Sequence, residues 1–390
     1  MRNQPRLPFL IAVACWTILL YMCFFRKTDN PGEQPLIRIH SKLYNKEYCV
    51  AYDFLVAEKK FRDDGLEPVT LTIHGTPDKL KSIESKPRNW DGPISLGFFI
   101  DFHSKDSLTH FAELHRCDGE FRDKVSVHIV FRLASPHTEC PAIEISPSDK
   151  PCTEILNSQD SFPQSTATSQ KLYPINLMRN IARKGAKSDL HFLSDSDVSM
   201  SAGFVEKVKP VANEMIDGKN KKMLVVRKFQ TDNKILPRDH VELQRDLNSY
   251  RVFEYDHKDS YAGKSAPNTS DWLYSSSISN LIVSWEIPYG GHQWEVQGIL
   301  HRNDLHNEDY FKSKSCDMQT LIYSLCRANY TFHLLSHVFN IHEGFETNTI
   351  FSKIDTNNNK SYCRRNYNNF NREMHAKFPD TLDKCGAFNR

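Results

Sequence analysis

The sequence predicts an α/β fold with a mostly parallel central sheet, placed after an N-terminal transmembrane helix. Short apolar runs alternate with helical segments between residues 69 and 131, which is typical of parallel strands covered by helices. A further apolar run, Leu190–Leu193, stops at two carboxylates, Asp195 and Asp197. Finally, residues 7–25 are almost wholly apolar and uncharged, and a stretch of roughly 17–25 such residues spans a bilayer.

Composition sets the limits on the class of protein. The chain has 390 residues, of which 39% are hydrophobic, and a formal net charge of +2. That length is sufficient for one large domain or two. The near-neutral charge lacks the basic excess that nucleic-acid binding requires, so we expect no nucleic-acid partner.

Three interpretations of residues 7–25 compete. A cleaved signal peptide would have a shorter apolar core and small residues before the cut, whereas residues 21–25 are bulky. A buried core helix would lie far from any other predicted element. We prefer a signal-anchor at 7–25, with a cytosolic N-terminus at 1–6 and a membrane attachment through this helix. Basic residues flank it on both sides, so they do not settle its orientation.

Cysteines and glycosylation motifs indicate the compartment. Eight cysteines follow the apolar stretch, an even number that suits disulfides in an oxidising lumen, and no Cys-x-x-Cys is present. Asn268, Asn329 and Asn359 begin Asn-x-Ser/Thr acceptor motifs. Together these features favour a single-pass type II protein of the secretory pathway whose main domain is lumenal.

The first half of the chain yields a strand–helix–strand series. A polar stem, 26–67, leads into the first packed residues near Tyr48–Tyr52, and the main domain is expected at 68–346. Strands are predicted at 69–73, 94–100 and 125–131, and helices at about 78–85 and 108–115. Residues 135–170 are rich in Ser, Thr and Pro, which predicts a surface insertion, closed by a local disulfide through Cys140 and Cys152.

A helix with an ambiguous basic pair precedes the two carboxylates. Pro174 suits the first turn of a helix at 174–183. Arg179 and Arg183 lie one turn apart on its polar side. Two interpretations remain open for the pair: a solvated face, or a face that binds phosphate next to the Asp-x-Asp strand.

The second half is less regular. Helices are predicted at 203–216 and 316–328, and strands at 223–226, 294–300, 332–335 and 338–344. Residues 234–260 are charged and weakly helical, and 266–289 are aromatic and irregular, which we expect over the site. The tail, 347–390, is rich in Asn and charge, and Cys363 and Cys385 are expected to attach it to the domain.

Asp195 and Asp197 are the candidate site. Side chains at i and i+2 of an extended segment point the same way, and open α/β sheets bind ligands at the carboxyl ends of their strands. Both carboxylates are therefore expected to converge on one hard cation, which would keep several waters and bridge to substrate phosphates. The alternative is a solvated turn after a strand, which an isolated Asp-x-Asp does not exclude.

The order of segments resembles the LARGE-type glycosyltransferases of glycosyltransferase family 49, which include β-1,4-glucuronyltransferases acting on α-dystroglycan glycans. The resemblance covers about 69–344. The segments that carry it are Trp90-Asp91-Gly92-Pro93-Ile94-Ser95-Leu96, Val127-His128-Ile129-Val130, Tyr173-Pro174-Ile175-Asn176-Leu177-Met178-Arg179-Asn180, Phe192-Leu193-Ser194-Asp195-Ser196-Asp197, Ala266-Pro267-Asn268-Thr269, Trp294-Glu295 with Arg302, and Phe339-Asn340-Ile341-His342.

The resemblance implies a GT-A fold, a Rossmann-like sheet that binds a nucleotide sugar with Mn²⁺, in a type II enzyme of the Golgi membrane. It implies Asp195, Asp197 and His342 as metal ligands, and imidazole among carboxylates and phosphates suits Mn²⁺. Asn176, Arg179 and Asp195 are the residues expected to bind the donor. The expected partners are a UDP-sugar, with glucuronic acid or xylose as the sugar, and a glycan or glycoprotein acceptor.

Inverting transfer needs a base for the attacking hydroxyl. Asp317 matches an acidic or amide position of the family and is the first candidate, with Glu295 the second. The sequence departs from the family just before Asp317, where its glycines are replaced by Ser313 and Ser315. Glycine allows positive φ and close backbone approach, so its loss predicts a different acceptor loop.

Three rival functions remain. A lumenal carbohydrate-binding or chaperone-like paralogue would keep the fold and lose catalysis. A metal-dependent phosphoesterase would require further His and Asp ligands for a second metal ion, which the sequence does not supply. A disulfide-bonded structural ectodomain would leave the Asp-x-Asp strand end without a role.

Overall fold

The structure is a computed structural model that describes residues 36–62, 64–101, 104–157, 173–255, 268–311, 316–344 and 350–389, with backbone only for 350–360 and 362. The chain divides into two units, Met1–Leu36 and Ile37–Arg390, and all elements below belong to the second. The predicted signal-anchor at 7–25 lies outside the described residues. Among the helices of the described ranges, none combines the length and apolar character needed to cross a membrane.

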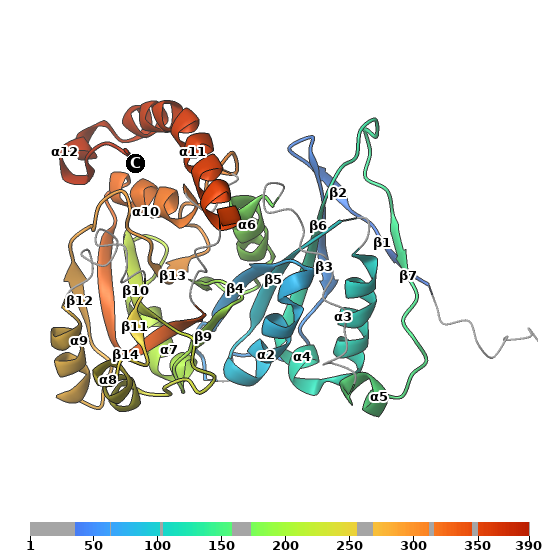
Figure 1. Ribbon diagram of the computed structural model, residues 1–390, viewed down its shortest axis with the longest axis horizontal. Helices are drawn as coiled ribbons and strands as arrows, with labels where there is room; N and C mark the ends of the chain where they lie inside the picture. Colours follow the sequence, from blue (N-terminus) through green and yellow to red (C-terminus); the bar gives the residue numbers. More distant parts are fainter. Residues whose placement is uncertain are drawn as a thin grey trace, which may run out of the picture. The chain divides into compact units, whose positions relative to one another are not determined.

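The second unit is built on a mixed sheet of twelve strands within the described ranges (Figure 1). Ten of them follow the order β12-β14-β10-β13-β8-β4-β5-β6-β3-β2, while β11 pairs with β10 and β9 with β14. The strands of this sheet are β2 (Lys42–Tyr44), β3 (Tyr48–Leu55), β4 (Val69–Gly75), β5 (Ile94–Ile100), β6 (Val125–Arg132), β8 (Leu190–Leu193), β9 (Val198–Met200), β10 (Lys222–Thr231), β11 (Phe253–Glu254), β12 (Ser284–Ile287), β13 (Gln297–His301) and β14 (Thr331–Glu343). A separate two-stranded sheet pairs β1 (Ile37–Ile39) with β7 (Ile143–Ile145).

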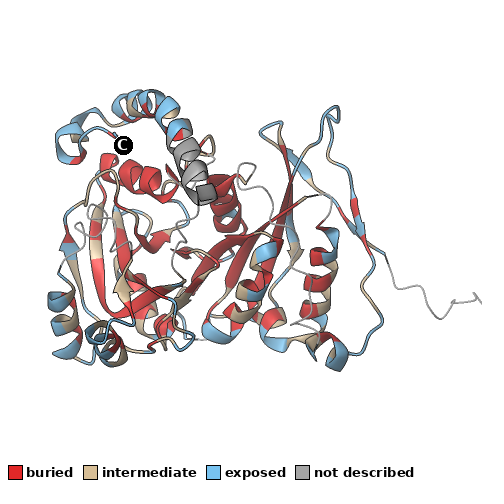
Figure 2. Ribbon diagram, viewed as in Figure 1, coloured by how far each residue is buried: buried red, intermediate tan, exposed pale blue. Residues whose placement is uncertain are grey.

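The centre of the sheet confirms the predicted α/β fold. Strands β8, β4, β5 and β6 are parallel neighbours, and the predicted helices connect them. The connections are η1 (Pro77–Lys79) and α2 (Leu80–Asn89) after β4, then α3 (Lys105–Cys117) and α4 (Gly119–Lys124) after β5. Figure 2 shows these parallel strands buried, with exposed residues on the outward side of α3. Such two-sided burial explains why each strand is a continuous apolar run in the sequence.

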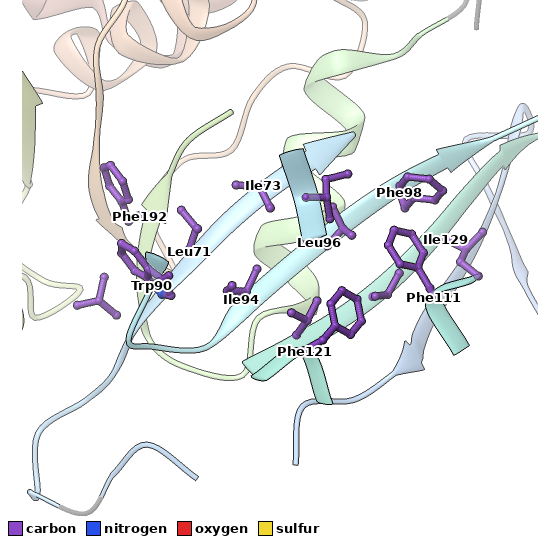
Figure 3. Packing of buried hydrophobic residues seen from close by; sticks show 14 of the residues in the cluster. Leu71, Ile73, Trp90, Ile94, Leu96, Phe98, Phe111, Phe121, Ile129 and Phe192 are labelled. Atoms are coloured by element: carbon purple, nitrogen blue, oxygen red, sulfur yellow. The ribbon is translucent and has the colours of Figure 1, made fainter. Parts of the chain in front are cut away.

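Alternate side chains of each parallel strand enter different cores. Leu96 and Phe98 of β5 pack with Phe111 of α3 and Phe121 of α4 on one face (Figure 3). Phe99, the residue after Phe98, packs with Met178 of α6 (Ile175–Gly185) on the other face. This period of two is the expected geometry of a pleated strand covered on both sides.

Helix α6 lies unusually close to the sheet because Gly97 has no side chain. A Cβ atom at Gly97 would be 2.7 Å from the carbonyl oxygen of Met178. The close packing brings the polar side of α6 next to the strand ends. The remaining helices are α5 (Cys152–Asn157), α7 (Phe204–Met215), α8 (His240–Asn248), α9 (Thr269–Ser277), α10 (Met318–Arg327), α11 (Ile350–Lys377), η6 (Pro379–Thr381) and α12 (Leu382–Cys385).

The flanks of the sheet differ from a simple parallel arrangement. Strand β13 is antiparallel to both β8 and β10, whereas β10 and β14 are parallel to each other. The predicted strands at 332–335 and 338–344 are one continuous strand, β14. The weakly helical interpretation of 234–260 holds only for α8, because β11 occupies Phe253–Glu254.

Two predicted boundaries change. Residues 37–55, assigned to the stem except for the packed segment near Tyr48, form β1, β2 and β3, and β3 pairs with β6. The region 347–390, expected to be a tail, contains the long helix α11. Phe370, Met374 and Phe388 from this region are buried in the core around α10 and β14. The folded unit therefore extends beyond both ends of the predicted domain.

All eight cysteines beyond the apolar stretch form disulfides. The pairs are Cys49–Cys140, Cys117–Cys152, Cys316–Cys363 and Cys326–Cys385. The last two confirm the predicted attachment of the C-terminal region. The expected local disulfide between Cys140 and Cys152 is wrong, because each of these cysteines is bonded to the body of the domain and holds the insertion at two points. Residues 158–170 of that insertion lie outside the described residues.

Candidate active site

Asp197 and His342 are brought together by strand pairing. The turn that follows β8 leads directly into β9, which pairs antiparallel with the end of β14, so that Val198 lies opposite His342. The Nε2 atom of His342 is 3.7 Å from Oδ2 of Asp197. Nδ1 of His342 lies 3.1 Å from the carbonyl oxygen of Gly344. Because a carbonyl only accepts, Nδ1 carries the proton, and in the neutral ring Nε2 keeps its lone pair toward Asp197.

The Asp197 carboxylate is partly exposed and faces positive groups. Its Oδ2 atom also accepts a hydrogen bond from Nζ of Lys79 at 3.1 Å. Burial raises the pKa of Asp197, but His342 and Lys79 lower it by more, so the net shift is downward. Burial likewise lowers the pKa of His342, and the neighbouring Asp197 raises it by more. Asp197 is therefore an ionised carboxylate at neutral pH.

Helix α2 holds the turn that carries both aspartates. Lys79, Ser82 and Lys86 occupy one side of the η1–α2 segment, at spacings of three and four residues. Ser82 Oγ donates to the carbonyl of Ser196 at 2.5 Å, and Lys86 Nζ donates to the carbonyl of Val198 at 2.7 Å. Burial lowers the pKa of Lys86 to about 8. The contacts of Lys79, Ser82 and Lys86 with this turn were not predicted from the sequence.

Asp195 has a different environment from Asp197. Its Oδ1 atom accepts from Arg179 at 2.7 Å, and its Oδ2 atom accepts from Gln297 at 2.9 Å. Burial raises the pKa of Asp195, but the charge of Arg179 and other nearby donors bring it well below the usual range. Gln297 is itself oriented by Asn340, whose amide donates to it at 2.6 Å. Both oxygens of Asp195 are thus held by protein groups.

Arg179 bridges two carboxylates, the buried Asp317 and the partly buried Asp195. Its second guanidinium nitrogen donates to Oδ2 of Asp317 at 2.6 Å, and the side chains of both residues are 5% exposed. The polar side of α6 is therefore buried. The interpretation of Arg179 and Arg183 as a solvated face is wrong. Arg183 donates to the carbonyls of His301 and Leu305. The pair fixes the loop that follows β13 and the start of α10.

Asn176 belongs to the same buried side of α6. Its amide donates to the carbonyl of Glu308 at 3.0 Å, and its oxygen accepts from Asn307 at 3.2 Å. The residue is fully buried. Asn176 and Arg179 therefore contact protein atoms, and their predicted part in donor binding remains a prediction that would act through the loop and carboxylates they hold.

The two candidate bases differ in accessibility. Asp317 is 3% exposed and bound to Arg179, and within the described residues its Oδ1 atom has no hydrogen-bond partner. The side chain of Glu295 is 25% exposed and accepts from Gln319 at 3.0 Å. Burial raises the pKa of Glu295 to about 7, assisted by the charges of Asp317 and Asp195 and opposed by Lys228. Geometry and acidity favour Glu295, although the sequence placed Asp317 first.

A metal ion would find two of the three predicted ligands facing each other. Across the described ranges, no three His, Cys, Asp or Glu side chains converge as a metal site. Asp197 and His342 fit a divalent cation, since a cation that also binds substrate phosphates and water needs only one or two protein ligands. Direct contact of Asp195 with the metal stays a prediction, because Arg179 and Gln297 occupy its oxygens.

Lys228 and Tyr255 complete the site and were missed. Nζ of Lys228 lies 3.6 Å from the centroid of the Tyr255 ring, and that ring is 5.7 Å from the His342 ring. One signal in the sequence was available, since Arg227 and Lys228 interrupt an apolar strand that otherwise continues to Phe229. Similarly, Gln297 and Asn340 lie two residues from the predicted Glu295 and His342.

Parts of the predicted site cannot be compared. The segment with Ser313 and Ser315, and the Ala266–Pro267 part of the family block, lie outside the described residues. Asn268 is the N-cap of α9, and its side chain accepts from the backbone of Ser270 at 3.0 Å. Asn329 is exposed at the turn between α10 and β14.

Comparisons with known proteins show the family to which the chain is similar. The model of the family described as "Glycosyl-transferase for dystroglycan" matches residues 68–379. Beta-1,4-glucuronyltransferase 1 of Danio rerio is 25% identical over 374 residues, covering 85% of this chain and 79% of the relative. Xylosyl- and glucuronyltransferase LARGE2s of Danio rerio is 22% identical over 312 residues, covering 80% of this chain and 36% of the relative.

Among solved structures, GalNAc-T7 with UDP, GalNAc and Mn²⁺ matches with a TM-score of 0.42 and 10% identity, covering 82% of this chain and 52% of that one. The family match is the decisive finding, because it extends over well more than half of the chain and includes every candidate site residue. The chain belongs to the family of glycosyl-transferases for dystroglycan and is a glycosyltransferase.

Proposed function

We propose that the chain transfers a sugar from a UDP-sugar to a glycan acceptor, with a divalent metal ion and inversion at the anomeric carbon. The observation that carries this proposal is the pair formed by Asp197, in the turn after β8, and His342, near the end of β14, 3.7 Å apart and both partly exposed. They lie next to a buried network that orients a carboxylate of raised pKa, Glu295. The relatives named glucuronyl- and xylosyltransferases support these two sugars as donors.

Each site residue has a separate role in the proposed reaction. Asp197 and His342 would hold the metal ion, Mn²⁺ by the choice of ligands, through one carboxylate oxygen and one imidazole nitrogen. A bound metal ion supplies neutralisation of the charge that develops on the diphosphate leaving group. Glu295 takes the proton from the attacking acceptor hydroxyl, since its pKa of about 7 leaves much of it ionised and basic near neutral pH. Arg179 holds Asp195 and Asp317 and thereby the wall of the site.

The location proposed is the Golgi membrane, as a single-pass type II protein with the catalytic unit in the lumen. Four disulfides support an oxidising compartment. The apolar stretch at 7–25 and the three glycosylation motifs agree with it. When the protein is expressed in secretory cells, endoglycosidase treatment should remove its N-linked glycans and lower its apparent mass. A protein unmodified at Asn268, Asn329 and Asn359 would overturn the lumenal location.

The alternative is a paralogue that binds nucleotide or carbohydrate without transferring sugar. The observation that favours it is the sequestration of Asp317 by Arg179, which removes the family's acidic residue from solvent. Glu295 argues for the enzyme. UDP binding without transfer to any acceptor would identify the alternative.

The test is a calorimetric titration of UDP into the purified full-length chain, with Mn²⁺ and with EDTA. We expect metal-dependent binding that is lost in Asp197→Ala. Arg88→Met is the matched control, because Arg88 forms an exposed ion pair with Asp118 on the outer side of the domain. Absence of UDP binding by the folded wild-type protein under both conditions would refute the proposal.

A further inference from the structure

Glu295 receives a hydrogen bond from Gln319, in the first turn of α10. Nε2 of Gln319 lies 3.0 Å from Oε2 of Glu295. The other carboxylate oxygen, Oε1, has Nζ of Lys228 at 4.0 Å, which is beyond hydrogen-bond distance. The amide therefore holds one oxygen of the carboxylate and leaves the other to take up a proton.

Gln319 is an unfavourable residue for the fold at this position. It is 4% exposed, and in the part of the chain that the structure describes its Oε1 atom has no hydrogen-bond partner. Its neighbours on α10 include the buried apolar residues Met318, Leu321 and Ile322. A buried amide oxygen without a donor lowers stability, whereas methionine has a similar length and no such group. The contact with Glu295 is thus the reason that the structure offers for an amide here.

Helix α10 holds this amide in a fixed place. Two disulfides join the two ends of the helix to the region 363–385. Tyr323 and Arg327 follow Gln319 at intervals of four residues, on the same side of the helix, and donate to backbone carbonyls beyond the end of α11. A donor fixed in this way imposes its orientation on a movable acceptor.

The backbone at Glu295 is also fixed, so that the remaining freedom is in its side chain. The neighbours Trp294 and Val296 are buried, and the Trp294 ring lies 5.1 Å from the ring of Phe332. The side chain of Glu295 is partly exposed, and other staggered positions would turn its carboxylate away from the site. The hydrogen bond from Gln319 selects one of these positions.

We propose that Gln319 is a positioning residue for Glu295 and keeps the carboxylate in the orientation that accepts the proton of the attacking hydroxyl. The inference rests on the proposed function. In that step the O–H bond of the hydroxyl breaks, and its oxygen forms a bond to the anomeric carbon. The bond from that carbon to the diphosphate breaks, UDP leaves with the electron pair, and Glu295 holds the proton. Gln319 acts on this step through Glu295.

The experiment measures release of UDP from UDP-glucuronic acid by the full-length chain with Mn²⁺, between about pH 5 and pH 9. Water attacks when no glycan is added, so the measurement does not depend on knowing the acceptor. Gln319→Met removes the donor and keeps the length of the side chain. Ser324→Ala is the matched control, because Ser324 is also buried in α10 and its Oγ atom has no partner among the described residues.

We expect Gln319→Met to lower the maximal rate about tenfold, because a misplaced base loses part of its contribution, and to change the KM for UDP-glucuronic acid less than about twofold. Loss of a hydrogen bond to an ionised carboxylate raises its pKa, so the midpoint of the pH dependence should rise by about one unit. The variant keeps the charged groups around Glu295, which are Lys228, Asp317, Asp195 and Arg179. The urea midpoint should stay the same or rise, because the unpaired amide oxygen is gone. Ser324→Ala should leave the rate and its pH midpoint unchanged.

A double variant separates positioning from a general effect on the fold. In a Glu295→Gln background there is no base to position, so Gln319→Met should lower the rate less than about twofold further. A further loss as large as in the wild-type background would overturn the proposal. An unchanged rate in the single variant would do so too, as would a lower rate with an unchanged pH midpoint and a lower urea midpoint.

Failure of the proposed function gives different results. A wild type that binds UDP and releases none from UDP-glucuronic acid or UDP-xylose would refute the proposed transfer, and the role of Gln319 with it. A wild type whose UDP release is not slowed by Glu295→Gln would refute Glu295 as the base and the role of Gln319, and would leave the transfer itself intact.

Discussion

The two aspartates of one short motif differ in how many protein donors hold them. The side chain of Asp195 is 19% exposed and lies among Arg179, Gln297 and Lys228, and both of its oxygens accept hydrogen bonds from protein donors. The side chain of Asp197 is 28% exposed, and within the described residues its charged partners are Lys79 and His342. Identical side chains two residues apart therefore differ in availability to a ligand. The first organises the protein, and the second is free to exchange its partners.

The largest expected effect is a difference in the free energy of unfolding between variants of the two aspartates. Asp195→Asn leaves the buried Arg179 with Asp317 alone, and removing one partner of a buried pair costs about 3–5 kcal/mol. We expect about 3 kcal/mol, because Arg179 keeps one carboxylate. Asp197→Asn should cost less than about 1 kcal/mol, as for other partly exposed pairs. Urea denaturation of both variants measures this, and equal losses would remove the distinction.

A second expected effect is a dependence of the sugar-transfer rate on pH, set by Glu295. Glu295 must be ionised to accept a proton, and burial raises its pKa to about 7. The transfer rate should therefore fall about tenfold for each pH unit below 7 and level off above it. Glu295→Gln should lower the rate throughout and abolish the slope. The same slope in this variant would assign the proton transfer to another group.

The smallest expected effect is on the affinity for Mn²⁺ at Asp197, the more exposed of the two aspartates. Lys79 occupies the same oxygen of Asp197 that faces His342, so it competes with a metal ion for that position. Lys79→Met should tighten Mn²⁺ binding by about two- to fivefold, a size typical of exposed ion pairs. Electron paramagnetic resonance of free Mn²⁺ measures the affinity directly. Lys219→Met, an exposed lysine elsewhere, serves as control, and weaker binding in Lys79→Met would instead make Lys79 a supporting group.

The parallel core was predictable, and its flanks were less so. Strands β5 and β8 are buried on both faces, so their apolar runs have no competing interpretation, and the predicted bounds 94–100 and 190–193 agree with the structure. Helix α11 buries Cys363, Tyr367, Phe370 and Met374, which are spaced by four, three and four residues, but this single short stripe stands among Asn and charged residues and was missed. A composition rich in Asn and charge does not reveal contacts made through covalent bonds.

The meeting of Asp197 and His342 was predictable from the sequence, but the residues that support them were not. Asp197 and His342 follow apolar strands, where polar side chains are conspicuous. The polar stripe of α6, with Arg179 and Arg183, has the spacing of a solvent-facing side, and only the irregular loop after β13 makes it an interior surface. Such a loop has no periodicity, so no pattern in the sequence indicates what it covers.

The covalent links on α10 have a consequence for how the protein is made. The disulfides Cys316–Cys363 and Cys326–Cys385 join both ends of this helix to residues 47 and 59 positions later in the chain. Asp317, next to Cys316, thus depends on a segment that leaves the ribosome after every proposed ligand and base. A translation product that stops at residue 360 would contain the whole set of site residues and neither link. Such a product would have every site residue and would lack the covalent support of the segment that carries Asp317.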